Sequence, residues 1–148
     1  MVCLGNICRS PAAHGVLEKM IRDKRLDGQL EVDSAGTGNF HLSESPDTRT
    51  IKAALARGYD LSRQQARQIN GSDYESFDLI LAMDKSNLLD LFERCPPHFR
   101  KKLGLFLSRS QSGLEEVPDP HWSGPLGFEM VLDLAEEVCG ALIDEFVD

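Results

Sequence analysis

The sequence lacks any long apolar run, and no stretch approaches the ~20 apolar residues that a membrane-spanning helix needs. The N-terminus also lacks a basic segment followed by an apolar one, so we expect no secretory signal peptide. Basic residues are outnumbered, with 16 Lys and Arg against 24 Asp and Glu and a net charge of −8. This balance argues against nucleic acid or an anionic membrane as a partner.

Cysteine and histidine are scarce, with four of each. The cysteines form neither a CxxC pair nor a zinc-ribbon pattern, and no histidine is paired with a cysteine or an acid at metal-ligand spacing. We therefore expect a cytoplasmic protein with reduced thiols, no metal and no other cofactor. The four cysteines are Cys3, Cys8, Cys95 and Cys139.

Length and composition are those of one soluble globular domain. The chain has 148 residues, of which 41% are hydrophobic and 27% charged. This is enough for a real core, and we see neither repeats nor a linker. We expect a single domain over residues 1–148.

What the chain does carry is a dense motif at its start, which reads Cys3-Leu4-Gly5-Asn6-Ile7-Cys8-Arg9-Ser10 and is followed by Pro11. Gly and Asn between the cysteine and the arginine allow a tight turn or left-handed backbone. Proline is favoured at the first position of a helix, and apolar residues follow it at helical spacing. The loop therefore runs into a helix N-terminus, where the backbone amides favour an anion.

The surroundings of Cys3 favour a thiolate, because a helix N-terminus and the neighbouring Arg9 both stabilise negative charge. Cys3 would then be a nucleophile at neutral pH, with Ser10 placed to hydrogen-bond to its sulfur. The guanidinium of Arg9 offers a planar fork of donors that matches two oxygens of a phosphoryl group. The alternative is that Cys3 and Cys8 are buried apolar residues and Arg9 is a surface charge. The turn residues and the following helix favour the anion-binding loop.

Apolar periodicity predicts helices that alternate with strands. We expect helices over 11–24, from a cap at Thr48 to Gly58, after a cap at Asp84, and over 128–146, with a capping box of Ser72 and Glu75 before a short helical turn. Strands are expected over 30–32, 77–83 and 103–107. The inward faces of the second, third and last helices are expected to comprise Ile51, Ala54, Leu55, Leu88, Leu89, Leu91, Phe92, Phe128, Val131, Leu132, Ala135, Val138, Cys139, Leu142, Ile143 and Phe146.

This alternation indicates the α/β class, with a doubly wound, parallel, four-stranded sheet and helices on both faces in three layers. Ligands of such sheets bind outside the carboxyl ends of the strands. The loop at Cys3 and the long polar loop over 108–125, which contains Asp119, both leave strands at those ends. We therefore expect the two loops to meet.

Together these residues resemble the low-molecular-weight protein tyrosine phosphatases. Residues 3–11 are similar to the phosphate-binding loop of that family. Further segments occur in the family order, namely Asp33–Thr37, Pro46–Arg49, Ala66–Ile69, Phe77–Ile80, Met83–Leu88 and Val117–Pro120. The resemblance covers essentially the whole chain. It implies an enzyme that hydrolyses phosphotyrosine monoesters through a cysteinyl-phosphate intermediate without a metal.

The resemblance also implies roles for single residues. Cys3 would be the nucleophile, and the loop amides and Arg9 would stabilise the equatorial oxygens of the phosphoryl group. Asp119 would be the general acid and later the base. Ser34 would hydrogen-bond the loop and hold its shape, and Asp84 would be a structural cap beside the site.

Substrates would be tyrosine-phosphorylated proteins or peptides, with phosphate and other oxyanions as inhibitors. The residues expected to line the walls of the substrate pocket are Leu4, Ile7, Phe40, His121 and Trp122. The family usually carries an aromatic residue directly after Asp-Pro. Here that position is His121, and Trp122 would take the role one residue later. By the same resemblance, Cys8 would form a reversible disulfide with oxidised Cys3, although it is otherwise read as backbone filler.

The chain departs from the family pattern at its first strand, because only Met1 and Val2 precede Cys3. Either the chain begins late through truncation, or the central strand is unusually short. Both would lower stability, because the loop at Cys3 would follow a weakly held strand. Two other functions are alternatives. An arsenate reductase of the same fold needs two further cysteines on a mobile segment. A phosphocarrier or phosphate-binding module would keep the loop but would not need Asp119.

Overall fold

The structure is a computed structural model that describes residues 1–122 and 124–147. Its sheet has four strands, and every recorded pairing between them is parallel. The order across the sheet is β2-β1-β3-β4, so β1 is central. The strands are β1 (Val2–Cys3), β2 (Ala35–Gly36), β3 (Ile80–Ala82) and β4 (Leu103–Leu105).

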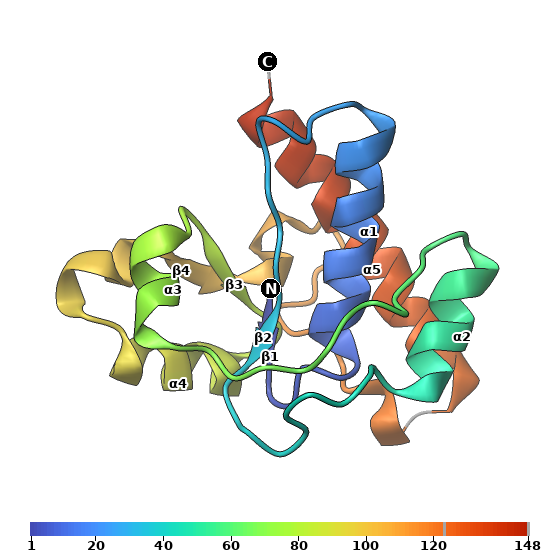
Figure 1. Ribbon diagram of the computed structural model, residues 1–148, viewed down its shortest axis with the longest axis horizontal. Coiled ribbons are helices and arrows are strands. Elements are labelled where there is room, and N and C mark those ends of the chain that lie inside the picture. Colours follow the sequence, from blue (N-terminus) through green and yellow to red (C-terminus); the bar gives the residue numbers. More distant parts are fainter. Residues whose placement is uncertain (123, 148) are drawn as a thin grey trace.

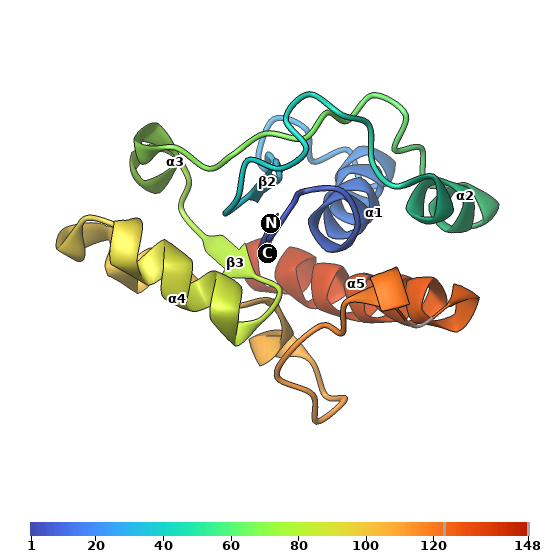
Figure 2. The ribbon, with the colours of Figure 1, turned by 90° about the horizontal axis from the view of Figure 1, so that it is seen from below.

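The main helices cover both faces of this sheet (Figures 1 and 2). Helices α3 and α4 lie on one side of the strands, and α1, α2 and α5 lie on the other. The predicted three-layer α/β fold is therefore confirmed. The helices are α1 (Arg9–Asp23), α2 (Thr48–Ala56), α3 (Gly71–Ser76), α4 (Lys85–Arg94) and α5 (Pro125–Phe146), with 3-10 turns over Pro97–Lys102, Phe106–Arg109 and Pro120–Trp122.

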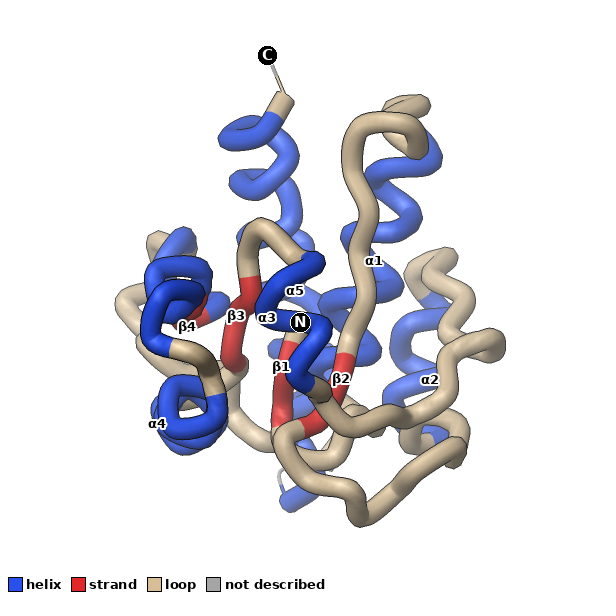
Figure 3. Tube along the Cα trace, turned by 60° about the vertical axis from the view of Figure 1, so that its left-hand side comes forward, coloured by secondary structure: helices blue, strands red, loops and turns tan. Residues whose placement is uncertain are grey.

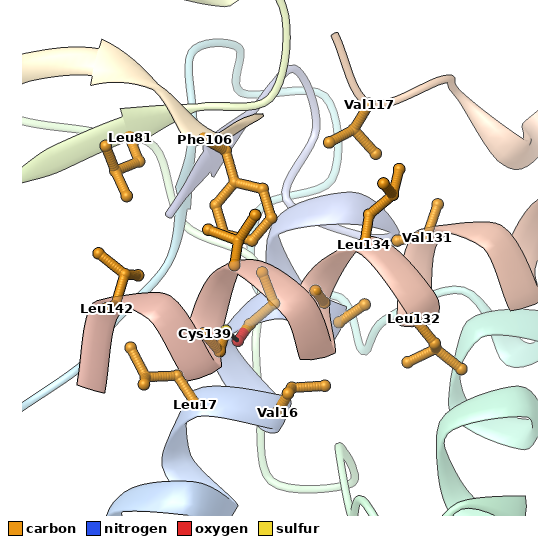
Figure 4. Close-up of a cluster of buried hydrophobic side chains, with 14 of the residues drawn as sticks. Val16, Leu17, Leu81, Phe106, Val117, Val131, Leu132, Leu134, Cys139 and Leu142 are labelled. Carbon is orange, nitrogen blue, oxygen red and sulfur yellow. Dashed lines mark hydrogen bonds between the residues drawn. The ribbon is translucent and has the colours of Figure 1, made fainter. Parts of the chain in front are cut away.

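Two apolar clusters bury the sheet on both faces. The larger cluster joins α1 to α5 through side chains such as Val16, Leu132 and Cys139, and Phe106 packs into it (Figure 4). The smaller cluster lies on the α4 side and centres on Leu91. Burial on both faces is the environment in which near-continuous apolar strands are stable.

Strand β1 has only two residues, yet it is paired on both sides. Its Val2 carbonyl accepts a hydrogen bond from Met83 at 2.9 Å, and its Cys3 carbonyl accepts one from Thr37 at 2.9 Å. The loop after Cys3 therefore leaves a strand that is held by its two neighbours. Because the sheet is parallel, the loops after β1 and β2 leave the same end of it (Figure 3).

The expected strand over 30–32 is wrong, since β2 is Ala35–Gly36. A ladder needs a partner, and β1 offers partners only opposite those two residues. Leu30 and Val32 pack partly buried against the core instead. The strands expected over 77–83 and 103–107 are likewise shorter, and Phe106 already begins a 3-10 turn.

The predicted helices are confirmed, but four side chains and two caps were placed wrongly. Leu55, Leu89, Phe92 and Phe146 are exposed by 45% or more, because their helices bury a narrower stripe than expected. Helix α2 is capped by Asp47 rather than Thr48. The capping box of α3 pairs Asn70 with Asp73, two residues before the expected pair of Ser72 and Glu75. No described helix combines the length and the apolar character that crossing a bilayer requires.

Candidate active site

Three carbonyl groups of the loop between β1 and α1 accept backbone hydrogen bonds, two from other segments and one from α1 itself. The Leu4 carbonyl accepts from Gly38 at 2.9 Å, the Ile7 carbonyl from Asp47 at 2.8 Å and the Cys8 carbonyl from Ala12 at 3.1 Å. Within the described part of the chain, no acceptor is recorded for the amides of residues 4–8. These amides therefore keep their hydrogens available as donors next to the N-terminus of α1, a position that favours negative charge.

Asn6 holds the shape of this loop. Its backbone is left-handed, with φ of 56°, a conformation that Asn tolerates better than most residues. Its Nδ2 donates to Ser10 Oγ at 2.9 Å, and its Oδ1 accepts from the Arg67 amide at 3.0 Å. Asn6 therefore ties the loop both to α1 and to the segment that leads to α3.

Cys3 lies at the base of the loop, with 4% of its surface exposed. Its Sγ is 3.0 Å from Ser10 Oγ, as the sequence predicts. Ser10 Oγ accepts from Asn6, and its one hydrogen can point either to the sulfur or to the Ala35 carbonyl, which lies farther away at 3.5 Å. A hydroxyl that donates to sulfur stabilises a thiolate more than a thiol.

Arg9 is buried and joins three parts of the chain. Its Nη1 donates to Asp84 Oδ2 at 2.8 Å and to the Val117 carbonyl at 3.0 Å. The other oxygen of Asp84 accepts from the Asn87 amide at 2.7 Å and caps α4. Both bonds of Arg9 to described residues start from Nη1, which leaves Nε and Nη2 for an oxyanion. Asp84 is the expected cap, but its ion pair with Arg9 was not foreseen.

The segment that carries Asp119 is anchored on both sides of that residue. Val117 is 2% exposed, and its amide donates to the Met83 carbonyl at 2.8 Å. Pro120 is buried in a small apolar pocket with Cys8 and Phe128. Asp119 itself is exposed, and its Oδ1 accepts from the His121 amide at 3.0 Å. Two buried neighbours thus present an exposed carboxyl group beside the loop of Cys8.

Ser34 does not bond the loop directly, contrary to expectation. Its hydroxyl is 2.9 Å from Nδ1 of His14, which lies on α1. Burial is the main cause that lowers the pKa of His14, so the neutral ring is favoured in this contact. The stronger brace, which the sequence analysis missed, is Arg67, whose guanidinium pairs with Asp73 and Asp33 while its amide bonds Asn6.

The candidate walls differ in exposure. Phe40 is 69% exposed and Leu4 48%, while Ile7 is half-buried and His121 is exposed. Trp122 has no described side chain, so its role stays a prediction. The sequence analysis missed His41, whose ring packs so closely on Gly5 that a Cβ there would lie 2.9 Å from His41 Cδ2.

Cys8 is a buried free thiol in the same loop. Burial, with the nearby negative groups adding to it, raises the pKa of Cys8 to about 11. The side chain is therefore protonated at neutral pH. Its disulfide with Cys3 stays a prediction.

Beyond this loop, the described residues form a cavity but no metal-binding cluster. They contain no group of three or more His, Cys, Asp or Glu side chains that could hold a metal ion. A cavity of about 430 Å³ lined by Leu30, Phe77 and Leu142 lies at the amino ends of the strands, away from the loop.

A parallel α/β fold that places a Cys–Arg anion loop and an Asp-Pro turn at the carboxyl ends of its strands defines the class of α/β phosphatases. Comparison with known families agrees: the model of the low molecular weight phosphotyrosine protein phosphatases matches residues 1–147. The chain belongs to this family, and it is a protein-tyrosine phosphatase of the phosphoric monoester hydrolase class.

Relatives and solved structures are similar over nearly the whole chain. A low molecular weight protein-tyrosine-phosphatase of Streptomyces coelicolor is 38% identical, over 96% of this chain and 88% of the relative. The human low molecular weight phosphotyrosine protein phosphatase is 34% identical, over 97% and 92%. The crystal structure of a protein tyrosine phosphatase from Entamoeba histolytica, with Hepes in its active site, has a TM-score of 0.93 and 39% identity, over 97% and 92%.

Proposed function

We propose that this chain hydrolyses phosphotyrosine monoesters through a cysteinyl-phosphate on Cys3, without a metal. The observation that carries the proposal is the contact between Arg9 Nη1 and the Val117 carbonyl at 3.0 Å. It joins the anion loop to the segment of Asp119 across 108 residues of sequence. Nucleophile, anion donors and acid are thereby supplied by segments that touch.

The first step transfers the phosphoryl group to sulfur. The Cys3 thiolate attacks phosphorus, so that a sulfur–phosphorus bond forms while the bond to the phenolic oxygen breaks. Asp119 gives its proton to that oxygen, which leaves as a phenol. The free amides of residues 4–8 and the Nε and Nη2 donors of Arg9 stabilise the charge on the three equatorial oxygens.

The second step returns the enzyme to its starting state. Water attacks phosphorus, and Asp119 accepts its proton. The sulfur–phosphorus bond breaks, its electron pair returns to Cys3 as a thiolate, and inorganic phosphate leaves. Ser10 supports both steps, because its hydroxyl lies 3.0 Å from the sulfur that changes charge.

Burial of the sulfur supports a tyrosine rather than a serine ester. Cys3 is 4% exposed, whereas Leu4 and Phe40 are largely exposed, so the reacting atom lies below an apolar rim. A long, flat phenol phosphate reaches such an atom better than a short serine phosphate. We propose tyrosine-phosphorylated proteins or peptides as substrates, phosphate and similar oxyanions as inhibitors, and the whole of residues 1–148 as one cytoplasmic domain.

The test is a comparison of phosphotyrosine and phosphoserine peptides, together with 4-nitrophenyl phosphate in the presence and absence of EDTA. We expect the enzyme to turn over phosphotyrosine faster than phosphoserine, at a rate that EDTA does not change, and we expect Cys3→Ser to be inactive. A stoichiometric release of product without turnover would instead indicate a phosphocarrier. Arsenate-dependent oxidation of thioredoxin would indicate a reductase, which the burial of Cys95 and Cys139 disfavours.

A further inference from the structure

Arg49, in the first turn of α2, links two segments that lie on either side of the anion loop. Its Nη2 and Nε bond the carboxylate of Asp47 at 2.9 Å and 3.1 Å. Its Nη2 also lies 3.2 Å from Nδ1 of His121, and its Nη1 lies 3.4 Å from the His121 carbonyl. Arg49 and His121 are 72 positions apart in the sequence, so their contact is tertiary.

The first partner of Arg49 is itself fixed to the phosphate-binding loop. The amide of Asp47 donates to the Ile7 carbonyl at 2.8 Å, and its carboxylate accepts from the Arg49 amide at 2.8 Å. The Asp47 side chain is only 14% exposed, while that of Arg49 is 46% exposed. Asp47 is thus the fixed end of the link.

The second partner lies beside the general acid. His121 follows Asp119 by two residues, and its amide already bonds the Asp119 carboxylate at 3.0 Å. The guanidinium also packs over the Phe128 ring, with 4.9 Å from Cζ to the ring centroid. The hydrogen bond to Asp47 is the largest cause that raises the pKa of Arg49. The charge of Asp119 also raises the pKa, so Arg49 and Asp119 are close enough to interact electrostatically.

We propose that Arg49 is a positioning residue that holds the turn 119–121 against Asp47, whose amide bonds the phosphate-binding loop at Ile7, and so sets where the Asp119 carboxyl meets the leaving oxygen. This inference rests on the proposed function of Asp119 as the acid. For Nδ1 of His121 to accept from Arg49, the ring must carry its hydrogen on Nε2. Arg49 thus acts on the exposed Asp119 through His121, whose amide bonds the Asp119 carboxylate.

The expected consequence is selective. A misplaced acid slows esters whose leaving phenol needs a proton, but hardly slows esters whose leaving group departs as an anion. Phenyl phosphate is the first kind and 4-nitrophenyl phosphate the second. A general loss of folded enzyme lowers both rates equally, so the ratio of the two kcat/KM values does not depend on the folded fraction.

The experiment measures this ratio for wild type, Arg49→Met, Asp119→Ala and the double variant, with Arg100→Met as a matched control. Arg100 also stacks on an aromatic ring, that of Phe92 at 4.1 Å, but lies in the 97–102 turn. We expect Arg49→Met to lower kcat/KM for phenyl phosphate by about tenfold and for 4-nitrophenyl phosphate by about twofold. In the Asp119→Ala background it should change neither rate further.

The outcomes separate the two claims. Equal losses on both substrates, or a full loss that persists in the Asp119→Ala background, would overturn the role of Arg49 while leaving the proposed acid intact. If Asp119→Ala does not lower kcat/KM for phenyl phosphate more than for 4-nitrophenyl phosphate, both the role of Asp119 as the acid and the role of Arg49 are contradicted. A ratio in Arg100→Met equal to that of wild type supports the assignment to Arg49, and a ratio as altered as in Arg49→Met contradicts it.

Discussion

Arg9 and Asp84 form a pair in which one carboxylate performs two tasks. Its Oδ2 accepts from Arg9 Nη1 at 2.8 Å, while its Oδ1 accepts from the Asn87 amide at 2.7 Å. The first bond orients the guanidinium that we propose binds the oxyanion, and the second caps the N-terminus of α4. The position of the arginine is therefore coupled to a helix on the other side of the sheet.

Asp84→Asn and Asp84→Ala should separate these two tasks. Asparagine is as good an N-cap as aspartate, so the first variant should keep the cap of α4 and lose only the stability that the ion pair with buried Arg9 contributes. Its kcat/KM should fall by about tenfold, because Arg9 loses the partner that orients it. Asp84→Ala should lose the same activity and, in addition, about 1 kcal/mol of stability from the missing cap. Wild-type activity in Asp84→Asn would contradict the coupling.

Gly36→Ala should disturb the phosphate-binding loop by steric contact alone. A Cβ at this position would lie 2.6 Å from the Leu4 carbonyl oxygen and 3.2 Å from the Asn6 amide, and neither backbone atom can turn aside. We expect weaker competitive inhibition by inorganic phosphate and a loss of about 1–3 kcal/mol in stability. Gly28→Ala is the matched control, because a Cβ there meets nothing within 4 Å. Similar inhibition constants in both variants would show that the loop does not rest on Gly36.

Asn6 combines left-handed backbone with two buried hydrogen bonds, and two variants should distinguish these contributions. Asn6→Gly keeps the backbone conformation and loses the bonds, which should cost about 1–3 kcal/mol. Asn6→Ala also adds the strain of a Cβ at positive φ, a further ~1 kcal/mol. Urea unfolding measures both values. Equal stabilities of the two variants would mean that the backbone conformation of Asn6 carries no cost.

Cys139 predicts how the stability of the fold depends on alkaline pH. Burial is the main cause that raises the pKa of this thiol from 9.0 to about 12. Between these values the unfolded chain has released the proton and the folded chain still holds it, so stability falls as pH rises from about 9 to 12. The effect of a three-unit shift is at most about 4 kcal/mol and is absent below pH 9. Cys139→Ala should flatten this part of the curve of unfolding free energy against pH, and an unchanged slope would rule the thiol out.

The features that could be predicted from the sequence are the local ones. The loop of Cys3 and Arg9, the cap at Asp84 and the apolar stripe of α5 depend on neighbours within a few turns of chain. The pairs Arg9–Asp84 and Arg49–His121 join residues 75 and 72 positions apart, and no spacing rule links such distant charges. The strand expected over 30–32 failed for a similar reason, because a ladder forms only where β1 provides a partner.

The side-chain faces of the helices show a second limit. Leu89 and Phe92 are apolar and follow the helical period of α4, yet each is at least 45% exposed. Of the apolar side chains of α4, only Leu91 is fully buried, because one short helix on the outer face of the sheet covers a narrow strip. Periodicity predicts which side of a helix is apolar, and the width of the buried strip depends on the neighbouring elements.

The central claim is that the sulfur of Cys3 carries the phosphoryl group during turnover. The most direct test is rapid acid quenching of the enzyme during its first turnover with 4-nitrophenyl phosphate, followed by mass mapping of its peptides. We predict one phosphoryl group on the peptide that contains Cys3 in the wild type, and none in Cys3→Ser, which should also be inactive. Turnover in Cys3→Ser, or a first-turnover burst with the phosphoryl group on any other residue, would contradict the account.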